Sequence, residues 1–475
     1  MSFLTSKENW KLFSRKAKSF WIDYRRNKIG LLGMATILAY VFVAFASPWM
    51  TPYHPIRDTR LAQGFAMPEW VTILPQNADL PRTIIDSIYW NVSENPELID
   101  VHWGEHTVVN YLGGKIKPTH VWLTYDFNYP HDTPPQTFQI EFTWLAENIE
   151  NITYSINLGM IRLNDTVQPI WWFDSSEAGS RLEFINSEGT DTFLRLGLDP
   201  IKDNVAERIF TGKGEYSLLL HVILMPTSKD AACKFTIEDG ELRILGLVHG
   251  LLGTDNAGRD LYSQLVAGVQ ISLTIGLLAA VISTSIGIVV GVTSGYTGGI
   301  VDEITMRIVD VLLCLPVLPL LLSLMFIYGK SPYYLILIIA VFWWLGLARI
   351  IRSQVLSLRE MPFIECAKAA GAGRFYTIFR HLIPNVLPVA FASMVLAVPG
   401  AIIMEAALSF LGFGQQAVPT WGKMLNHAFN YGAFTHMAWW WIFPPGLAIV
   451  GLCLAFVFVG HAVDEIANPR LRRRR

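Results

Sequence analysis

The sequence is poor in charged residues and in cysteine. Only 16% of its 475 residues are Asp, Glu, Lys or Arg, against about 25% in an average soluble domain. Cys233, Cys314, Cys366 and Cys453 lie far apart and form no CxxC pair, so neither a disulfide framework nor a metal site is expected. Hydrophobic residues, by contrast, make up 52% of the chain.

A phosphate-binding loop of the form GxxxxGK[ST] is also missing. The glycine-rich stretch GVTSGYTGG (Gly291–Gly299) lacks the lysine and follows a long apolar run. We therefore expect that this chain does not bind ATP.

The charge is unevenly distributed along the chain. Residues 52–250 contain 27 acidic and 14 basic residues, whereas the remainder contains 12 acidic and 23 basic ones. An acidic block is therefore inserted into a basic, apolar protein.

Six apolar runs reach the roughly 18 residues that a transmembrane helix needs. They are Ile29–Met50, Leu265–Tyr296, Val311–Tyr328, Pro332–Ile351, Val386–Leu408 and Met437–Val463. The first defines a helical segment at residues 29–51. The runs predict an α-helical membrane protein with six transmembrane helices. A large soluble protein with buried helices is the alternative, and six runs of this length argue against it.

Basic segments orient these helices, because Lys and Arg are enriched in cytoplasmic loops. The N-terminal segment 1–28 and the tail 465–475 are basic, and the loop after the fourth run carries Arg352, Arg359, Lys368, Arg374 and Arg380. We expect both termini and this loop to lie in the cytoplasm. Residues 52–260 would then be extracellular, in a multi-pass protein of the plasma membrane.

Residues 71–246 have a different pattern. Alternating segments such as THVWLTYDFNY (Thr119–Tyr129), TFLRLGL (Thr192–Leu198) and EYSLLLHVILM (Glu215–Met225) are separated by turn signals. They predict an inserted all-β sandwich or jelly-roll domain. The aromatic residues of PIWWFD (Pro169–Asp174) either pack in its core or form a platform on which a sugar or peptide stacks, and core packing is the commoner role.

The segment ECAKAAGAGRFYTIFRHLIPN (Glu365–Asn385) resembles the cytoplasmic EAA loop of permease subunits of binding-protein-dependent ABC importers. That loop reads EAAxxxG followed by IxLP. Glu365, Ala367, Gly371 and Pro384 match it, Cys366 replaces the first alanine, and His381 stands at the position of the isoleucine.

Further stretches resemble the C-type permease of the dipeptide, oligopeptide and nickel branch. GTDNAGRDLYSQLV, EAALSFLGFG, PTWGKMLNHA and WWWIFPPGLAIV occur in the family's order. The resemblance covers about residues 20–70 and 247–473. It gives no function for the β-rich block, which divides a loop that is short in the family.

The resemblance implies a type I ABC importer permease core over residues 252–464, with five transmembrane helices and the EAA loop at 359–384. It also implies that this loop couples the membrane helices to an ATPase. The implied coupling residues are Glu365, Cys366, Ala367, Gly371, Arg374, Arg380 and Pro384. The two arginines have an alternative role at lipid headgroups.

The partners that the resemblance implies are a second, related permease, two cytoplasmic ATPases that bind ATP and Mg, an extracellular solute-binding protein and the lipid bilayer, but no nucleic acid. The resemblance also implies that the chain itself is a transport subunit and not an enzyme, and that it binds no cofactor. Short peptides are the expected cargo, with oligosaccharides or nickel as the alternatives.

Acidic residues near the apolar runs are further candidates. Asp255, Arg259 and Asp260 are expected either to form ion pairs near an outer gate or to dock the solute-binding protein. Glu405 and Asp310 are candidates for the transport pathway, because charges at membrane depth are often functional. A helix-end role for Glu405 and an interfacial ion pair for Asp310 are the alternatives.

Two other classes of protein remain open for the inserted domain. The chain could be a membrane-anchored module that captures a glycan or a surface partner, or the domain could be a hydrolase that trims substrate. We favour a scaffold that docks or shields the solute-binding protein.

Overall fold

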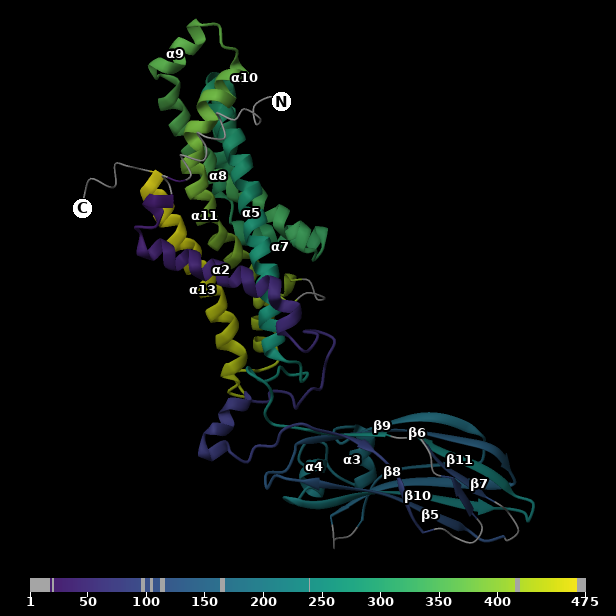
Figure 1. Cartoon of the computed structure of the whole chain (residues 1–475). Coiled ribbons are helices and arrows are strands. Elements are labelled where there is room, and N and C mark those ends of the chain that lie inside the picture. Colours follow the sequence, from purple (N-terminus) through teal and green to yellow (C-terminus); the bar gives the residue numbers. More distant parts are fainter. Residues whose placement is uncertain are drawn as a thin grey trace. The chain divides into compact units, whose positions relative to one another are not determined.

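The computed structural model describes residues 18, 21–94, 99–102, 106–111, 116–162, 167–238, 240–414 and 419–467. Most of the predicted basic N-terminus 1–28 and residues 468–475 of the predicted tail lie outside this set. The chain forms two compact units, a helical one up to Arg57 and from Leu261 onward, and a β-rich one from Asp58 to Asp260 (Figure 1).

In the described part of the helical unit, five helical segments are long and apolar enough to cross a membrane. The helices at their centres are α2 (Lys28–Met50), α5 (Leu261–Thr297), α8 (Pro332–Arg359), α11 (Ile383–Leu408) and α13 (Trp439–Ala467). Between 17% and 50% of each apolar segment is buried inside this chain. Much of their apolar surface is therefore left for lipid or for another subunit.

The predicted third span, Val311–Tyr328, is wrong as one continuous helix. The structure divides this stretch between α6 (Gly299–Cys314) and α7 (Val317–Tyr328), whose axes differ by 90°. Leu315 between them is extended (ψ 140°), because the ring of Pro316 disfavours a helical conformation in the residue before it. The described residues thus contain five candidate spans, or six if this bent pair crosses the membrane as one.

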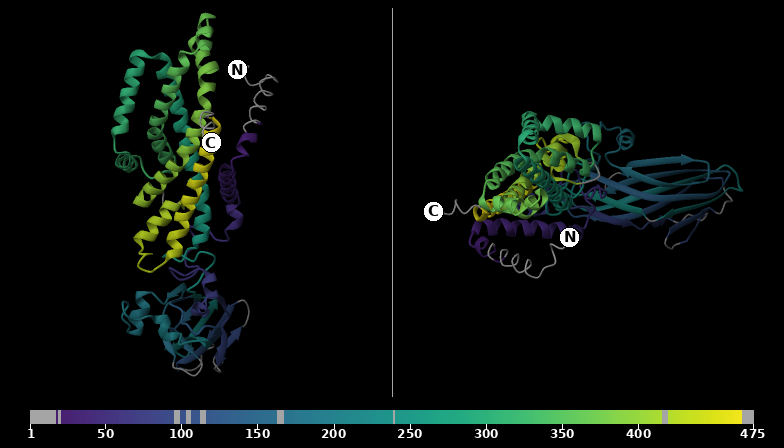
Figure 2. Two further views of the ribbon diagram at one scale, coloured as in Figure 1. Left: turned by 90° about the vertical axis from the view of Figure 1, so that its left-hand side faces the viewer. Right: turned by 90° about the horizontal axis from the view of Figure 1, so that it is seen from above.

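Short helices complete the helical unit. They are α9 (Pro362–Ala369), α10 (Arg374–Thr377), a π-helical turn (Ile378–Leu382), a second one (Ser409–Phe413) and α12 (Trp421–Asn430). The two views of Figure 2 show α2 running along the outside of the other helices. The Asn27 side chain just before α2 donates a hydrogen bond from Nδ2 to Glu465 Oε2 of α13 at 3.0 Å.

A stripe of glycines brings α5 and α8 into close contact. Gly287, Gly291 and Gly295 recur every four residues, so they lie on one face of α5. A Cβ atom at Gly291 would lie 2.7 Å from the backbone oxygen of Ala348, and one at Gly295 would lie 3.0 Å from that of Arg352. Small residues at this spacing allow two membrane helices to approach each other backbone to backbone.

The β-rich unit contains two antiparallel sheets within its described residues. The seven-stranded sheet has the order β1-β12-β6-β11-β4-β3, with β9 also paired to β6, and the five-stranded sheet has the order β2-β5-β10-β7-β8. The strands are β1 (Ile84–Ile88), β2 (Asn91–Glu94), β3 (Ile99–His102), β4 (His106–Tyr111), β5 (Thr119–Tyr129), β6 (Thr137–Glu150), β7 (Ile152–Arg162), β8 (Gln168–Ser175), β9 (Gly179–Asn186), β10 (Gly214–Pro226), β11 (Ala232–Glu238) and β12 (Gly240–Leu245).

One hydrophobic core is shared by the two sheets. Leu218, Leu220 and Val222 of β10 alternate with more exposed residues and belong to the same buried cluster as Phe138 and Ile140 of β6. This period of two is the signature of strands that face a core on one side. The β-rich inserted domain is confirmed, while its jelly-roll topology stays a prediction.

The unit also contains short helices, so it is not all-β. They are the 3-10 turns Glu69–Ile73 and Pro75–Asn77, α3 (Thr190–Leu196) and α4 (Val205–Ile209). The predicted strand Thr192–Leu198 is wrong, because most of it lies in α3. Phe193 and Leu196, three residues apart, both pack on the core, and Gly197 ends the helix in a left-handed conformation (φ +65°).

We predict that Gly291→Leu destabilises the helical unit, because the new side chain needs space that the α8 backbone occupies. Gly346→Leu on α8 is the matched control, since a Cβ there has nothing within 4 Å. Thermal unfolding in detergent should show a lower midpoint for the first variant only. Equal midpoints would contradict the close approach of α5 and α8.

Candidate functional site

The segment that connects α8 to α11 forms two short helices joined by a tight turn (Figure 1). α9 ends where the Ala372 amide donates to the Ala367 carbonyl (3.0 Å) and the Gly371 amide donates to the Lys368 carbonyl (2.9 Å). These two bonds define a Schellman motif, whose left-handed position suits glycine. Gly371 occupies that position with φ +83°.

Three buried side chains fix this connecting segment to the helix bundle. Ile364, Thr377 and Leu382 are each 0% exposed, and the two apolar ones pack in a cluster with Ile351 and Val355 of α8. The loop is therefore held against the end of the helices rather than extended away from them.

The opposite side of the segment is exposed and partly aromatic. Phe375 is 80% exposed and Phe379 67% exposed, with Tyr376 between them at 54%. Contiguous exposed apolar residues commonly mark an interaction surface. We call these three residues the aromatic surface of the loop.

The predicted coupling residues lie together on this segment. Glu365, Cys366, Gly371, Arg374, Arg380 and Pro384 are exposed, and Ala367 is half-buried. Glu365 lies in the first turn of α9, and Pro384 lies in the first turn of α11, where proline is well tolerated. The structure thus brings all seven into one loop and its flanking turns.

An ion pair that the sequence did not reveal anchors α6 to α8 beside the glycine stripe. Arg352 donates from Nε to Asp302 Oδ1 at 2.6 Å and from Nη2 to Asp302 Oδ2 at 2.5 Å. Ser294 of α5 also donates to Asp302. The two residues are 50 positions apart, and Asp302 had no signal beyond its place in the turn that links two apolar runs.

The predicted pathway residues have different environments. Asp310 on α6 accepts a hydrogen bond from Arg349 on α8, and both side chains are about half exposed. Glu405 is only 1% exposed and accepts from Ser409 Oγ at 2.7 Å. Glu405 also lines a small cavity of about 10 Å³ together with Lys330 and Thr420. Neither geometry tests a role in transport, so the pathway role stays a prediction.

The three residues predicted near an outer gate form one tight, buried turn of the β-rich unit. Asp255 is 0% exposed, and its Oδ2 lies 2.7 Å from Arg259 Nε. Asp255 Oδ1 accepts from the Ala257 and Arg259 amides at 2.9 and 3.1 Å. These contacts support the structural role that the sequence allowed.

Asp260 in the same turn faces a partly buried histidine. His249 Nε2 lies 3.8 Å from Asp260 Oδ1. Burial lowers the pKa of His249, and the charges of Asp260 and Glu69 offset this only in part. Across the described residues, no group of three or more His, Cys, Asp or Glu side chains is placed to hold a metal ion.

Comparisons with known proteins match the helical unit. Residues 287–473 match the family of binding-protein-dependent transport system inner membrane components, and residues 17–68 match the N-terminal transmembrane domain of oligopeptide transport permease C. The dipeptide transport system permease protein DppC of Bacillus subtilis (strain 168) is 38% identical over 46% of this chain and 69% of its own length.

The oligopeptide transport system permease protein OppC of Escherichia coli (strain K12) is 39% identical over 46% of this chain and 72% of its own length. The chain belongs to the family of binding-protein-dependent transport system inner membrane components. Members of this family are membrane permeases.

Two solved structures show a limited likeness. The inward-facing methionine ABC transporter MetNI has a TM-score of 0.32 at 20% identity and covers 44% of this chain and 96% of its own. TmCBM61 in complex with β-1,4-galactotriose has a TM-score of 0.19 at 15% identity and covers 32% of this chain and 86% of its own. Both scores are too low to support a structural argument.

We predict that Arg352→Ala destabilises the helical unit by about 2–4 kcal/mol, because it leaves the Asp302 carboxylate buried without its cation. Arg349→Ala, one turn earlier on α8, is the control and should cost at most about 1 kcal/mol, since its pair with Asp310 is half exposed. Denaturant unfolding in detergent would measure both. Equal losses in the free energy of unfolding would show that the Asp302–Arg352 pair stabilises the unit no more than the half-exposed pair does.

Proposed function

We propose that this chain is the permease subunit of an ATP-driven importer and that its Pro362–Leu382 loop docks on a partner ATPase. The loop's own geometry carries the proposal. Its buried residues tie it to α8 and α11, while its aromatic surface and Glu365 are left exposed. A rigid loop with an unpaired apolar surface is suited to transmit motion from a partner to the helices that flank it.

The proposed assembly contains this chain, a second related permease, two ATPases that bind ATP and Mg, and an extracellular solute-binding protein. The α8–α11 loop and both termini would lie in the cytoplasm, and residues 52–260 outside. The chain itself would bind no cofactor, and the ATPases would hydrolyse ATP. Large apolar areas of the long helices that this chain leaves uncovered support contact with a second permease as well as with lipid.

Movement of the ATPases would reach the transport pathway through α8 and α11. Both helices continue directly from the loop, and α8 is fixed to α5 by the glycine stripe and to α6 by the Asp302–Arg352 pair. A displacement of the loop therefore shifts several helices together. We propose Glu405 and Asp310 as pathway residues within this moving group.

Short peptides are the proposed cargo, because the relatives that match the chain are named dipeptide and oligopeptide permeases. The β-rich unit would lie outside as a scaffold beside the solute-binding protein. The Asp255–Arg259 turn would hold that unit's own fold near the start of α5.

We predict that Gly371→Ala weakens ATPase binding by about fivefold. A Cβ in the left-handed conformation costs about 1 kcal/mol, and this strain disfavours the loop conformation that we propose to dock. Gly373→Ala is the matched control. It lies in the same loop, also has open space around its Cβ position, and has an ordinary extended backbone (φ −69°, ψ 163°).

Co-purification of the ATPases with each variant from detergent-solubilised membranes would measure the difference. Equal recovery with both variants would show that the loop's turn has no part in docking. Recovery of the native chain with no ATPase at all would contradict the proposed function.

A further inference from the structure

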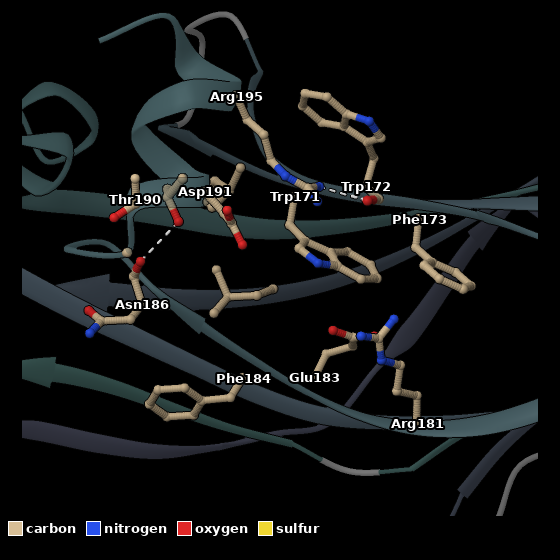
Figure 3. Close-up of a pocket in the computed structure, with 14 residues that line it drawn as sticks. Trp171, Trp172, Phe173, Arg181, Glu183, Phe184, Asn186, Thr190, Asp191 and Arg195 are labelled. Atoms are coloured by element: carbon tan, nitrogen blue, oxygen red, sulfur yellow. Dashed lines mark hydrogen bonds and ion pairs between the residues drawn. The ribbon is translucent and has the colours of Figure 1, made fainter. Parts of the chain in front are cut away.

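A groove opens along one side of the β-rich unit, between the two sheets (Figure 3). β8, at the end of the five-stranded sheet, and β9, which among the described strands pairs only with β6, provide two of its sides. α3 provides the third. The groove has a volume of about 500 Å³, within the range of sites for small organic ligands.

Two aromatic side chains of β8, Trp171 and Phe173, line this groove. Trp171 and Phe173 on β8 stack with their planes only 7° apart and their centroids 6.3 Å apart. The ring of Phe142 packs edge to face on Trp171, with 5.8 Å between the ring centroids, and the ring centroids of Trp144 and Phe173 lie 5.2 Å apart. Trp171 and Phe173 are themselves half-buried, so the core holds the two rings in place while part of each stays accessible.

Three of the four charged residues that line the groove, Arg181, Glu183 and Arg195, already make contacts with the protein. Arg181 Nε lies 3.4 Å from Glu183 Oε1, and that oxygen also accepts from Trp144 Nε1 at 3.4 Å. Arg195 donates from Nη1 to the Trp172 carbonyl at 2.6 Å, and its guanidinium carbon lies 4.6 Å from the centroid of the Trp172 ring. Figure 3 shows this arginine beside the tryptophan at the rim.

These contacts favour a neutral ligand with hydroxyl groups over an extended peptide. An extended peptide binds a free strand edge through main-chain hydrogen bonds, but Arg195 already occupies the Trp172 carbonyl on β8. The charge of Glu183 is also balanced by Arg181, which leaves it less available to a peptide terminus. Guanidinium and carboxylate groups still have further donors and acceptors, and these suit neutral hydroxyl groups.

We propose that this groove binds a neutral oligosaccharide of pyranose units. A pyranose ring has an apolar face of C–H groups, which matches the flat face of an indole. Its rim of hydroxyl groups matches the fixed polar groups of Arg195 and Glu183 and the exposed carboxylate of Asp191 on α3. The site is independent of the proposed transport function and would tether the β-rich unit to a glycan.

The test is binding of soluble tetrasaccharides to the full chain in lipid nanodiscs, without any partner subunit. The probes are the tetraoses of the cello, xylo, manno, galacto and malto series at millimolar concentrations, with tetra-alanine as the peptide probe. Isothermal titration calorimetry reports the affinity. At least one tetrasaccharide should bind, and tetra-alanine should not.

Trp171→Ala should weaken that affinity by at least about tenfold. Asp191→Ala should weaken it as well, and this exposed position keeps the test valid if loss of Trp171 disturbs the fold. Trp122→Ala is the control and should have no effect, because Trp122 stacks on His221 on β10 and is not among the residues that line the groove. Thermal unfolding of each variant verifies that the unit is folded.

Three outcomes would overturn the proposal. The first is that none of the five tetrasaccharides binds. The second is that tetra-alanine binds and that Asp191→Ala or Trp171→Ala abolishes this binding, since the groove would then be a peptide site. Loss of saccharide binding with Trp122→Ala alone would place the site on the outer face of the sheet.

Discussion

The close approach of α5 and α8 is the constraint on which the rest of the helical unit depends. In lipid, burial of apolar side chains contributes little free energy to helix association. Association therefore depends on close backbone packing and on polar contacts between helices. Gly287, Gly291 and Gly295 supply the first. The Asp302–Arg352 pair, with Ser294, supplies the second at the same end of the two helices.

The proposed coupling loop follows from this arrangement. α8 ends at Arg359, seven residues after Arg352, so the loop begins close to the most strongly fixed part of the helix. Ile364 and Leu382 then return the chain to the same cluster. Gly371 reverses its direction between α9 and α10, and the aromatic surface stays exposed because the buried positions are filled by other residues of the loop.

Most of the helical unit could be predicted from the sequence, because long runs with few charges have few structural options in a protein. The position of the loop was also predictable, since its motif is local. The break at Leu315 was not, because a proline inside an apolar run is compatible with a kink as well as with two separate helices.

Contacts between distant residues escaped prediction for a different reason. Nothing in the sequence pairs Asp302 with Arg352, and an aspartate after an apolar run is usually solvated. For the aromatic residues of β8 the sequence allowed two roles, because core packing and ligand stacking require the same residue types. The structure shows that Trp171 and Phe173 are half-buried at the edge of the sandwich, where they pack on the core and also line the groove.

Labelling of the native Cys366 with a maleimide would test the central claim most directly. Cys366 is exposed on α9, Cys233 and Cys453 are buried, and Cys314→Ser removes the other exposed thiol. Inverted membrane vesicles that carry the assembled complex would be compared with vesicles stripped of ATPases by urea. If the loop docks on an ATPase, Cys366 reacts slowly in the assembled complex and quickly after stripping. Equally fast labelling in both would contradict the account.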